Sequence, residues 1–122
     1  MNNQRENPLK DKSYLFAIEI VKACQFLVND KREFVISKQL LRSGTSIGAN
    51  IEEANQAESK SDFIHKLSIS NKEAFETHYW LRILRDTNYI NSESANTLLL
   101  LCEELLKMLT ASIKSSKQNH KR

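Results

Sequence analysis

The stretch from Leu40 to Ala57, LLRSGTSIGANIEEANQA, constrains the fold more than any other part of this 122-residue chain. Apolar residues recur in and just before it at intervals of four, seven, four and three, which place them on one face of a helix: Ile36, Leu40, Ile47, Ile51 and Ala54. The only two glycines of the chain, Gly44 and Gly48, interrupt this pattern without shifting its phase. A glycine inside a helix costs ~1 kcal/mol relative to alanine, so two of them require a reason.

Close helix packing is the reason that we favour for Gly44 and Gly48. The small residues around them would let a neighbouring helix approach closely, and Ser46 belongs to the same band. The alternative is a loop, SGTSIGAN, between two short helices. The apolar register, which continues across both glycines, predicts a continuous helix.

Asn50 and Glu53 lie three residues apart beside the apolar face. They are either a partly solvated polar edge or a buried pair that meets a partner helix and fixes its register. Buried polar groups are tolerated when they are hydrogen-bonded, so the second alternative would make them structural residues.

Length and composition predict one domain, residues 1–122, in a cytoplasmic protein. No apolar run is long enough to span a membrane, and the polar start of the chain does not resemble a secretory signal. The two cysteines, Cys24 and Cys102, lie in apolar helical contexts without metal-like spacing. We expect buried, reduced thiols.

Helical periodicity and capping residues predict four helices, at about residues 8–28, 36–56, 60–87 and 92–115, followed by a basic tail at 116–122. The expected caps are Asn7 before Pro8, Ser37, Ser59, and Asn91 or Ser92. Short connections between long helices indicate an all-α, antiparallel, up-down-up-down four-helix bundle. The first and last helices are apolar nearly all round, and this surplus apolar surface predicts a homo-oligomer.

No motif for catalysis or for a cofactor is found. The three histidines are not spaced three or four apart, and the Glu-x-x-His pairs of a di-iron bundle are missing. The serines and cysteines lack the neighbours that nucleophilic catalysis requires, and there is no phosphate loop. We therefore expect no enzyme, no metal and no cofactor.

Basic residues form the most suggestive pattern in the chain. Four lysines of the last helix and tail are spaced seven, three and four apart: Lys107, Lys114, Lys117 and Lys121. Lys38 and Arg42 follow a similar spacing on the second helix. These six residues are candidate contacts to nucleic-acid phosphates, although a solvated lysine face is the alternative. Glu73, Glu76 and Tyr79 are expected to form a hydrogen-bonded network that supports packing. Phe75, Tyr79 and Trp80 widen the apolar face of the third helix, and Tyr79 and Trp80 are expected in the core, with stacking on bases as the alternative.

Two segments together carry a family resemblance: LRSGTSIGANIEEA at 41–54 and FIHKLSISNKEAFETHYWLRIL at 63–84. The chain resembles the four-helix-bundle family named after a protein encoded in intervening sequences of bacterial 23S ribosomal RNA genes. The resemblance extends from about Tyr14 to Ile113, and its most specific residues are Arg42, Ser46, Gly48, Asn50, Ile51, Glu53, Ala54, Phe63, Glu73, Ala74, Glu76, Thr77, Tyr79, Trp80 and Leu81. Many family members carry proline where this chain has Gly48.

The resemblance implies a bundle that assembles into a ring, typically a pentamer, and a fold similar to the accessory protein of diversity-generating retroelements, which binds nucleic acid and a reverse transcriptase. Our first hypothesis is a non-enzymatic homo-oligomer that binds nucleic acid, RNA rather than DNA, through charge. The alternative is a scaffold ring that docks another protein.

Overall fold

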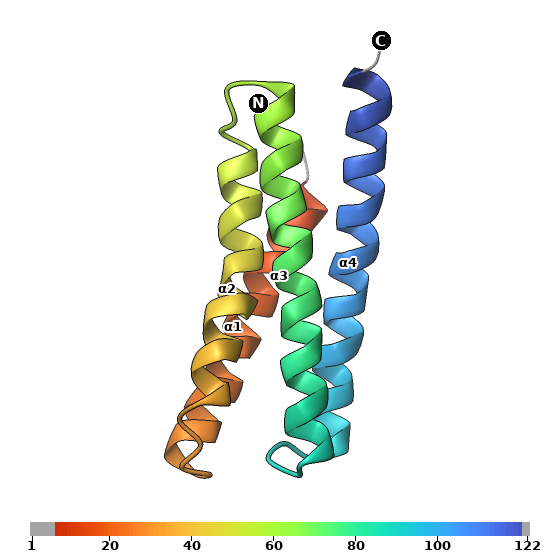
Figure 1. Ribbon diagram of the computed structural model, residues 1–122. Helices are drawn as coiled ribbons and strands as arrows, with labels where there is room; N and C mark the ends of the chain where they lie inside the picture. The colour runs from red at the N-terminus through yellow and green to blue at the C-terminus, as the bar shows by residue number, and fades with distance from the viewer. Residues whose placement is uncertain (1–6, 121–122) are drawn as a thin grey trace.

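The computed structural model describes residues 7–120, and within that range all regular secondary structure is helical. Its four helices are α1 (Pro8–Asn29), α2 (Ile36–Ala54), α3 (Lys60–Asp86) and α4 (Ser92–His120). They lie side by side, and the chain reverses direction at each short connection (Figure 1). Each helix packs on the next, and α1 also contacts α4. The prediction of four helices and no strand is confirmed for the described residues.

The last helix is longer than predicted. α4 continues to His120 instead of ending near residue 115, so most of the expected tail is helical. The physical reason is packing, because Ile113 lies against the core and Ser116 is buried. Lys121 lies outside the described residues.

Three of the four predicted N-caps are confirmed. The side chain of Asn7 accepts a hydrogen bond from the backbone N–H of Lys10 at 3.1 Å, and Pro8 follows at the first helical position. The Ser59 hydroxyl accepts from the N–H of Asp62 at 3.0 Å. Asn91 caps α4 through a 2.8 Å hydrogen bond from the N–H of Ser94.

The predicted cap at Ser37 is wrong. Ser37 lies inside the first turn of α2, and its hydroxyl donates to the carbonyl oxygen of Glu33 at 2.7 Å. The carboxylate of Glu33 caps the helix instead, accepting from the N–H groups of Val35, Ile36 and Ser37 at 3.2, 3.0 and 2.7 Å. Three N–H groups that no helical carbonyl reaches are thereby satisfied.

Both glycines lie within one continuous helix, so the prediction of a continuous helix is confirmed and the loop alternative is wrong. Neither glycine has a positive φ. A Cβ atom built on Gly44 would lie 2.8 Å from Cγ2 of Ile20, and one built on Gly48 would lie 3.2 Å from Oγ of Ser13. The missing side chains therefore let α1 approach the backbone of α2.

The core runs the length of the bundle and contains residues of all four helices. Its largest fully buried apolar side chains are Phe16, Ile20, Leu27, Leu40, Ile47, Ile51, Leu67, Leu81, Leu84, Leu105 and Leu109. Cys24 and Cys102 are also buried, as predicted, and both thiols are free.

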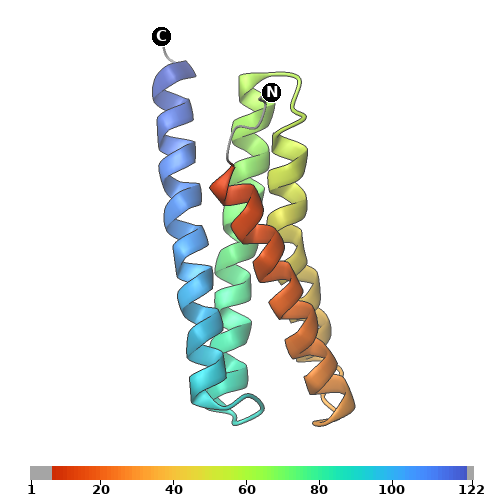
Figure 2. The ribbon, with the colours of Figure 1, turned by 180° about the vertical axis from the view of Figure 1, so that it is seen from behind.

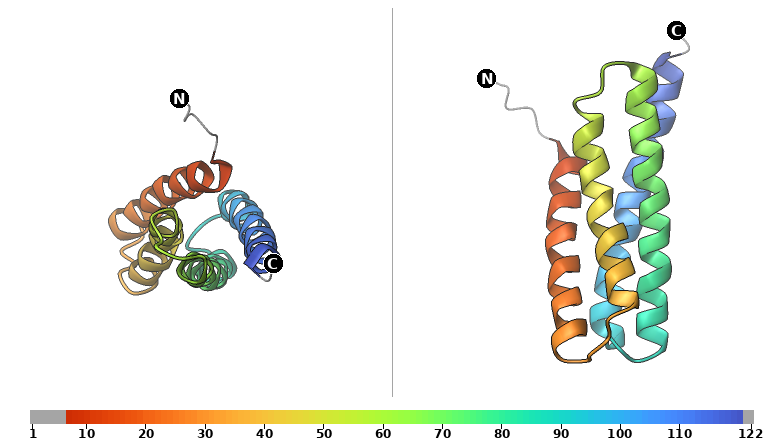
Figure 3. Two further views of the ribbon diagram at one scale, coloured as in Figure 1. Left: turned by 90° about the horizontal axis from the view of Figure 1, so that it is seen from above. Right: turned by 60° about the vertical axis from the view of Figure 1, so that its left-hand side comes forward.

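α1 is inclined to the other helices. Its first turns lie near α4, and its later turns diverge from α4 and follow α2 (Figure 2). Seen from above, α1 runs obliquely along one side of the bundle, from beside α4 towards α2 (Figure 3). Several apolar side chains of α1 are exposed, among them Tyr14, Leu15, Ile18, Val21 and Phe26.

Candidate nucleic-acid interface

The basic side chains of α4 lie on the side of that helix that faces α3. Lys107, Lys114 and Lys117 are all exposed. They line two adjoining grooves between the helices, one together with Phe75 of α3 and the other with Asn71 of α3. None of the three lysines forms an ion pair within the described part of the chain. Three ammonium groups are therefore available to an anion on one edge of the bundle.

The two candidate residues on α2 do not join this group. Lys38 is exposed in the first turn of α2, at the end of the bundle opposite to the last turns of α4 (Figure 1). The guanidinium of Arg42 contacts two carboxylates of α3: its Nη1 lies 3.1 and 3.2 Å from the oxygens of Glu73, and its Nη2 contacts Glu76. Two carboxylates compensate the charge of Arg42, so the structure assigns it to helix packing.

This ion-pair cluster extends to the single tryptophan. The indole Nε1–H of Trp80 donates to Glu76 at 3.2 Å. Burial raises the pKa of Glu76, but the hydrogen bonds from Trp80 and Arg42 outweigh burial and lower the pKa overall. The network predicted around Glu73 and Glu76 is therefore present, with Trp80 in the place expected for Tyr79.

The polar residues on the outer edge of α2 are not a buried pair. The side-chain amide of Asn50 donates to the carbonyl of Ser46 in its own helix at 2.8 Å, and the Ser46 hydroxyl donates to the carbonyl of Arg42 at 2.6 Å. Glu53 is exposed and pairs with Lys66 of α3 at 2.8 Å. Of the two alternatives for Asn50 and Glu53, the partly solvated edge is the one that the structure shows.

Buried hydroxyl groups join α2 to α3, and these contacts were not predicted from the sequence. Ser70 donates to the carbonyl of Ile47 at 2.8 Å. The hydroxyl of Thr77 lies 2.9 Å from that of Ser43 and 2.8 Å from the carbonyl of Glu73. The signal was present, because Ser70 and Thr77 are seven residues apart and in phase with the apolar positions of α3.

Two aromatic residues expected to widen the core of α3 are exposed. The side chains of Phe75 and Tyr79 are 60% and 50% exposed. Arg82 lies over the ring of Tyr79 at 5.7 Å, and Trp80 meets that ring edge-on with 5.2 Å between the centroids. Of Phe75, Tyr79 and Trp80, only Trp80 packs against the core, so the core prediction is wrong for Tyr79.

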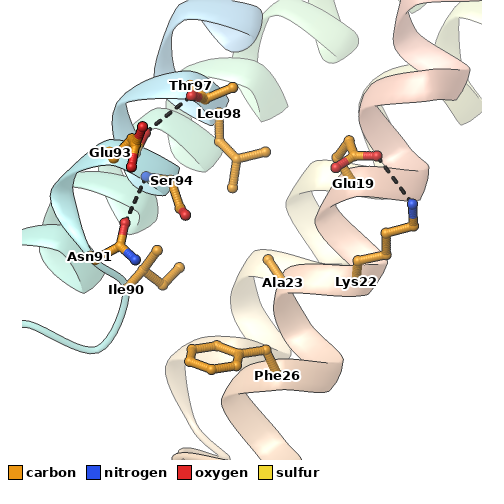
Figure 4. Close-up of a pocket in the computed structure, with 10 residues that line it drawn as sticks. All are labelled: Glu19, Lys22, Ala23, Phe26, Ile90, Asn91, Glu93, Ser94, Thr97 and Leu98. Carbon is orange, nitrogen blue, oxygen red and sulfur yellow. Dashed lines mark hydrogen bonds and ion pairs between the residues drawn. The ribbon is translucent and has the colours of Figure 1, made fainter.

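A second surface of interest is the groove between α1 and α4, which encloses 510 Å3. Ala23 and Phe26 of α1 face Leu98 and Ile90 across it, with polar side chains at the rim (Figure 4). The inclination of α1 produces this groove, and the surplus apolar residues predicted for α1 line part of it.

No group of three histidine, cysteine, aspartate or glutamate side chains in residues 7–118 is arranged to hold a metal ion. Burial raises the pKa of Cys24 to about 11 and that of Cys102 to about 12, so both thiols are protonated and unreactive near neutral pH. None of the four helices, as far as they are described, is long and apolar enough to cross a membrane.

These features define a class: a four-helix protein with close α1–α2 packing and with a lysine face on α4 that forms no ion pair with the described residues. Comparison with known proteins identifies the family. A model described as "23S rRNA-intervening sequence protein" matches residues 5–111, and the chain belongs to that family. This confirms the resemblance. The description of the family names no enzymatic activity.

A crystal structure of another protein is similar to this chain in both sequence and fold. It is described as a protein with unknown function from the S23 ribosomal protein family of Bacteroides thetaiotaomicron, and it is 55% identical to this chain. The match covers 87% of this chain and 98% of the other, with a TM-score of 0.86. No match is found among curated proteins.

Proposed function

We propose that this protein is a non-enzymatic, up-down-up-down helical bundle that assembles into a ring, of five copies on the family resemblance, and binds RNA through charge. The observation that carries the proposal is the set of three exposed, unpaired lysines on one side of α4. Membership of a family named for intervening sequences in ribosomal RNA supports it. The two free, buried thiols support a cytoplasmic location.

The lysines suit phosphate contacts better than base recognition. Lysine is a compact point charge on a flexible stem, and it lacks the planar fork through which arginine reads a base edge or a phosphate in two contacts. Lys107 lies two helical turns before Lys114, and Lys117 lies one turn after it, so the three side chains share one side of α4 and could follow a phosphate backbone. The affinity would then fall with rising salt and depend little on base sequence. We retain Lys38 as a peripheral contact and leave out Arg42, whose guanidinium is engaged by Glu73 and Glu76.

Assembly would multiply a modest charge. One chain carries a formal net charge of only +3. Several lysine faces held in one ring would contact several phosphates at once, which raises the overall affinity without any new kind of contact. The uncovered apolar residues of α1 supply surface for such an assembly, since exposed apolar patches mark interfaces.

The test is salt-dependent RNA binding by a matched pair of variants. Lys114→Glu/Lys117→Glu and the control Lys10→Glu/Lys22→Glu both change the formal net charge from +3 to −1, two units for each substitution. Fluorescence anisotropy with a labelled RNA at low and high salt would measure affinity, and light scattering coupled to size exclusion would measure assembly. We expect the α4 variant to lose most of the binding and the α1 control to keep most of it. Equal binding by both variants would refute the assignment to α4.

A protein-binding scaffold is the second candidate function. It is favoured by the open α1–α4 groove, whose apolar floor and polar rim suit a partner helix. A ring that purifies without nucleic acid, and binds no RNA at low salt, would support the scaffold over the RNA-binding proposal.

A further inference from the structure

The groove between α3 and α4 combines an exposed aromatic ring with unpaired cations. Its main section encloses 500 Å3 and is lined by Phe75 of α3 and by residues of α4 that include Lys107, Thr110 and Lys114. A second section encloses 430 Å3, shares Thr110 and Lys114, and adds residues that include Asn71, Lys117 and Gln118. Because the two sections share lining residues, we treat them as one surface, the α3–α4 groove.

Phe75 is the unusual residue of this groove. A phenylalanine gains stability by burial, yet its side chain is 60% exposed on a well-formed helix. Tyr79, one turn further along, has its ring engaged by Arg82 and Trp80. No such aromatic or cation–π contact is found for Phe75 within residues 7–118. Its ring is therefore available to stack.

The charges around the ring favour an anionic partner. Lys107 and Lys114 line the same section as Phe75 and form no ion pair with described residues. The acid of that section, Glu103, contacts His78, with 2.8 Å between the carboxylate and Nε2 of the imidazole. In the second section, Oδ1 of Asn71 is a buried acceptor without a hydrogen-bond partner among the described residues. A partner with negative charge, flat apolar faces and hydrogen-bond donors would match this set.

We propose that the α3–α4 groove binds single-stranded RNA, with an unpaired base stacked on Phe75 and the adjoining phosphates on Lys107 and Lys114. This inference rests on the proposed function and deepens it by naming the form of RNA. Aromatic side chains stack on the bases of single strands regardless of base identity, whereas a duplex keeps its base faces inside the helix. Duplex RNA could reach the lysines alone.

The experiment compares two labelled RNAs of equal phosphate number, a short oligouridylate and a blunt duplex, by fluorescence anisotropy at several salt concentrations. The variants are Phe75→Ala, which removes the ring, Phe75→Tyr, which keeps it, and the control Phe34→Ala. Phe34 is an aromatic residue of similar exposure, 55%, in the α1–α2 connection. Circular dichroism and light scattering would verify that each variant keeps the fold and the assembly of the wild type.

We expect Phe75→Ala to weaken binding of the single strand roughly 5- to 100-fold, the range for loss of one stacked base. Duplex binding should change less than about twofold, and the dependence of affinity on salt should stay the same, because no phosphate contact is removed. Phe75→Tyr and Phe34→Ala should bind both RNAs as the wild type does.

Two results would overturn the stacking inference and leave the proposed function standing. One is wild-type affinity of Phe75→Ala for the single strand while Lys114→Glu/Lys117→Glu has lost binding. The other is an equal loss for single strand and duplex in a correctly folded Phe75→Ala. Failure of the wild-type protein to bind either RNA at low salt would instead refute the proposed function itself.

Discussion

Gly44 provides the sharpest test of how α1 and α2 are held together. A Cβ atom at this position would lie 2.8 and 2.9 Å from Cγ2 and Cγ1 of Ile20, closer than Cβ atoms normally come to another atom. Ile20 is fully buried, so its side chain has no free space into which to move. Gly44→Ala therefore tests whether the close approach matters more for stability than helix propensity.

The two effects have opposite signs and known sizes. Alanine improves helix propensity by ~1 kcal/mol, and overpacking a core contact costs ~1–3 kcal/mol. We expect Gly44→Ala to lower the free energy of unfolding by about 1 kcal/mol net. At Gly48 the added Cβ would lie 3.2 Å from Oγ of Ser13 and 3.4 Å from its carbonyl oxygen, so a shift of a few tenths of an ångström suffices. Gly48→Ala should therefore leave stability within roughly 0.5 kcal/mol of the wild type, because the cost of this small shift offsets most of the ~1 kcal/mol gain in helix propensity.

Measuring Gly44→Ala in a second background would show whether contact with Ile20 causes its destabilising effect. In an Ile20→Ala background both Cγ atoms are removed, and the cavity alone costs ~2–5 kcal/mol. Adding Gly44→Ala there should raise stability by up to ~1 kcal/mol, because the contact that remains, 3.3 Å to the Cβ atom retained at position 20, requires only a small shift and the propensity gain exceeds its cost. The effect of one substitution would thus change sign between backgrounds, a coupling of about 2 kcal/mol that is typical of residues in contact.

Urea unfolding followed by far-ultraviolet circular dichroism would measure all four proteins of this cycle. The protein concentration must be equal throughout, because assembly would stabilise the folded state by mass action. The reasoning is refuted if Gly44→Ala stabilises the wild-type protein, or if its effect has the same sign and size in both backgrounds.

Three further predictions follow from polar contacts. Glu33→Gln should destabilise the protein by ~1 kcal/mol at neutral pH, as loss of a helix cap does. Burial raises the pKa of Glu33, but the three backbone N–H bonds lower it overall, so the stabilisation by this carboxylate is present above the ordinary carboxylate pKa and is lost as the pH falls through the lowered pKa of the folded state. Thermal melts of the wild type and the variant across an acid pH series should therefore converge at low pH. Arg42→Gln should change stability by at most ~1 kcal/mol, because the pair is partly exposed, but should alter the fluorescence of the single tryptophan through Glu76; an unchanged spectrum would contradict the network. Ser70→Ala should cost ~1 kcal/mol in a urea titration by leaving the Ile47 carbonyl without its bond, whereas Ser68→Ala, whose exposed hydroxyl bonds only within its own helix, should be neutral.

Helix positions and most caps could be predicted because they depend on neighbours in the sequence. Asn7, Ser59 and Asn91 each cap a helix through an N–H three residues later, a spacing that is visible in the chain. The cap by Glu33 was hidden, since this residue lies in a charged connection where the chain turns through a left-handed residue, Arg32, with φ of 56°. The carboxylate of Glu33 can then reach the N–H groups of the first turn of α2, but no local sequence pattern predicts this contact.

The candidate site could be predicted only in part. The lysine spacing on α4 identified exposed residues on one side of the helix, because spacing within one helix is set by its geometry. The partners of Arg42 could not be read in the same way, since Glu73 and Glu76 lie 31 and 34 residues away and meet it only after α2 and α3 have packed. The exposure of Phe75 depends likewise on where α4 stops covering α3, which is a property of the assembled bundle.

The exposed apolar residues of α1 and the α3–α4 groove lie on different sides of the bundle. α1 packs on α2 and α4, and seen from above its outer side faces away from the edge where α3 and α4 meet (Figure 3). An assembly formed through the apolar residues of α1 would therefore leave the α3–α4 groove open to solvent. Copies joined in this way would present several grooves at once, so weak stacking and charge contacts in each groove would combine into a higher overall affinity. The same separation means that substitutions in the groove should change RNA binding without changing assembly, and that loss of assembly should weaken binding without removing the site.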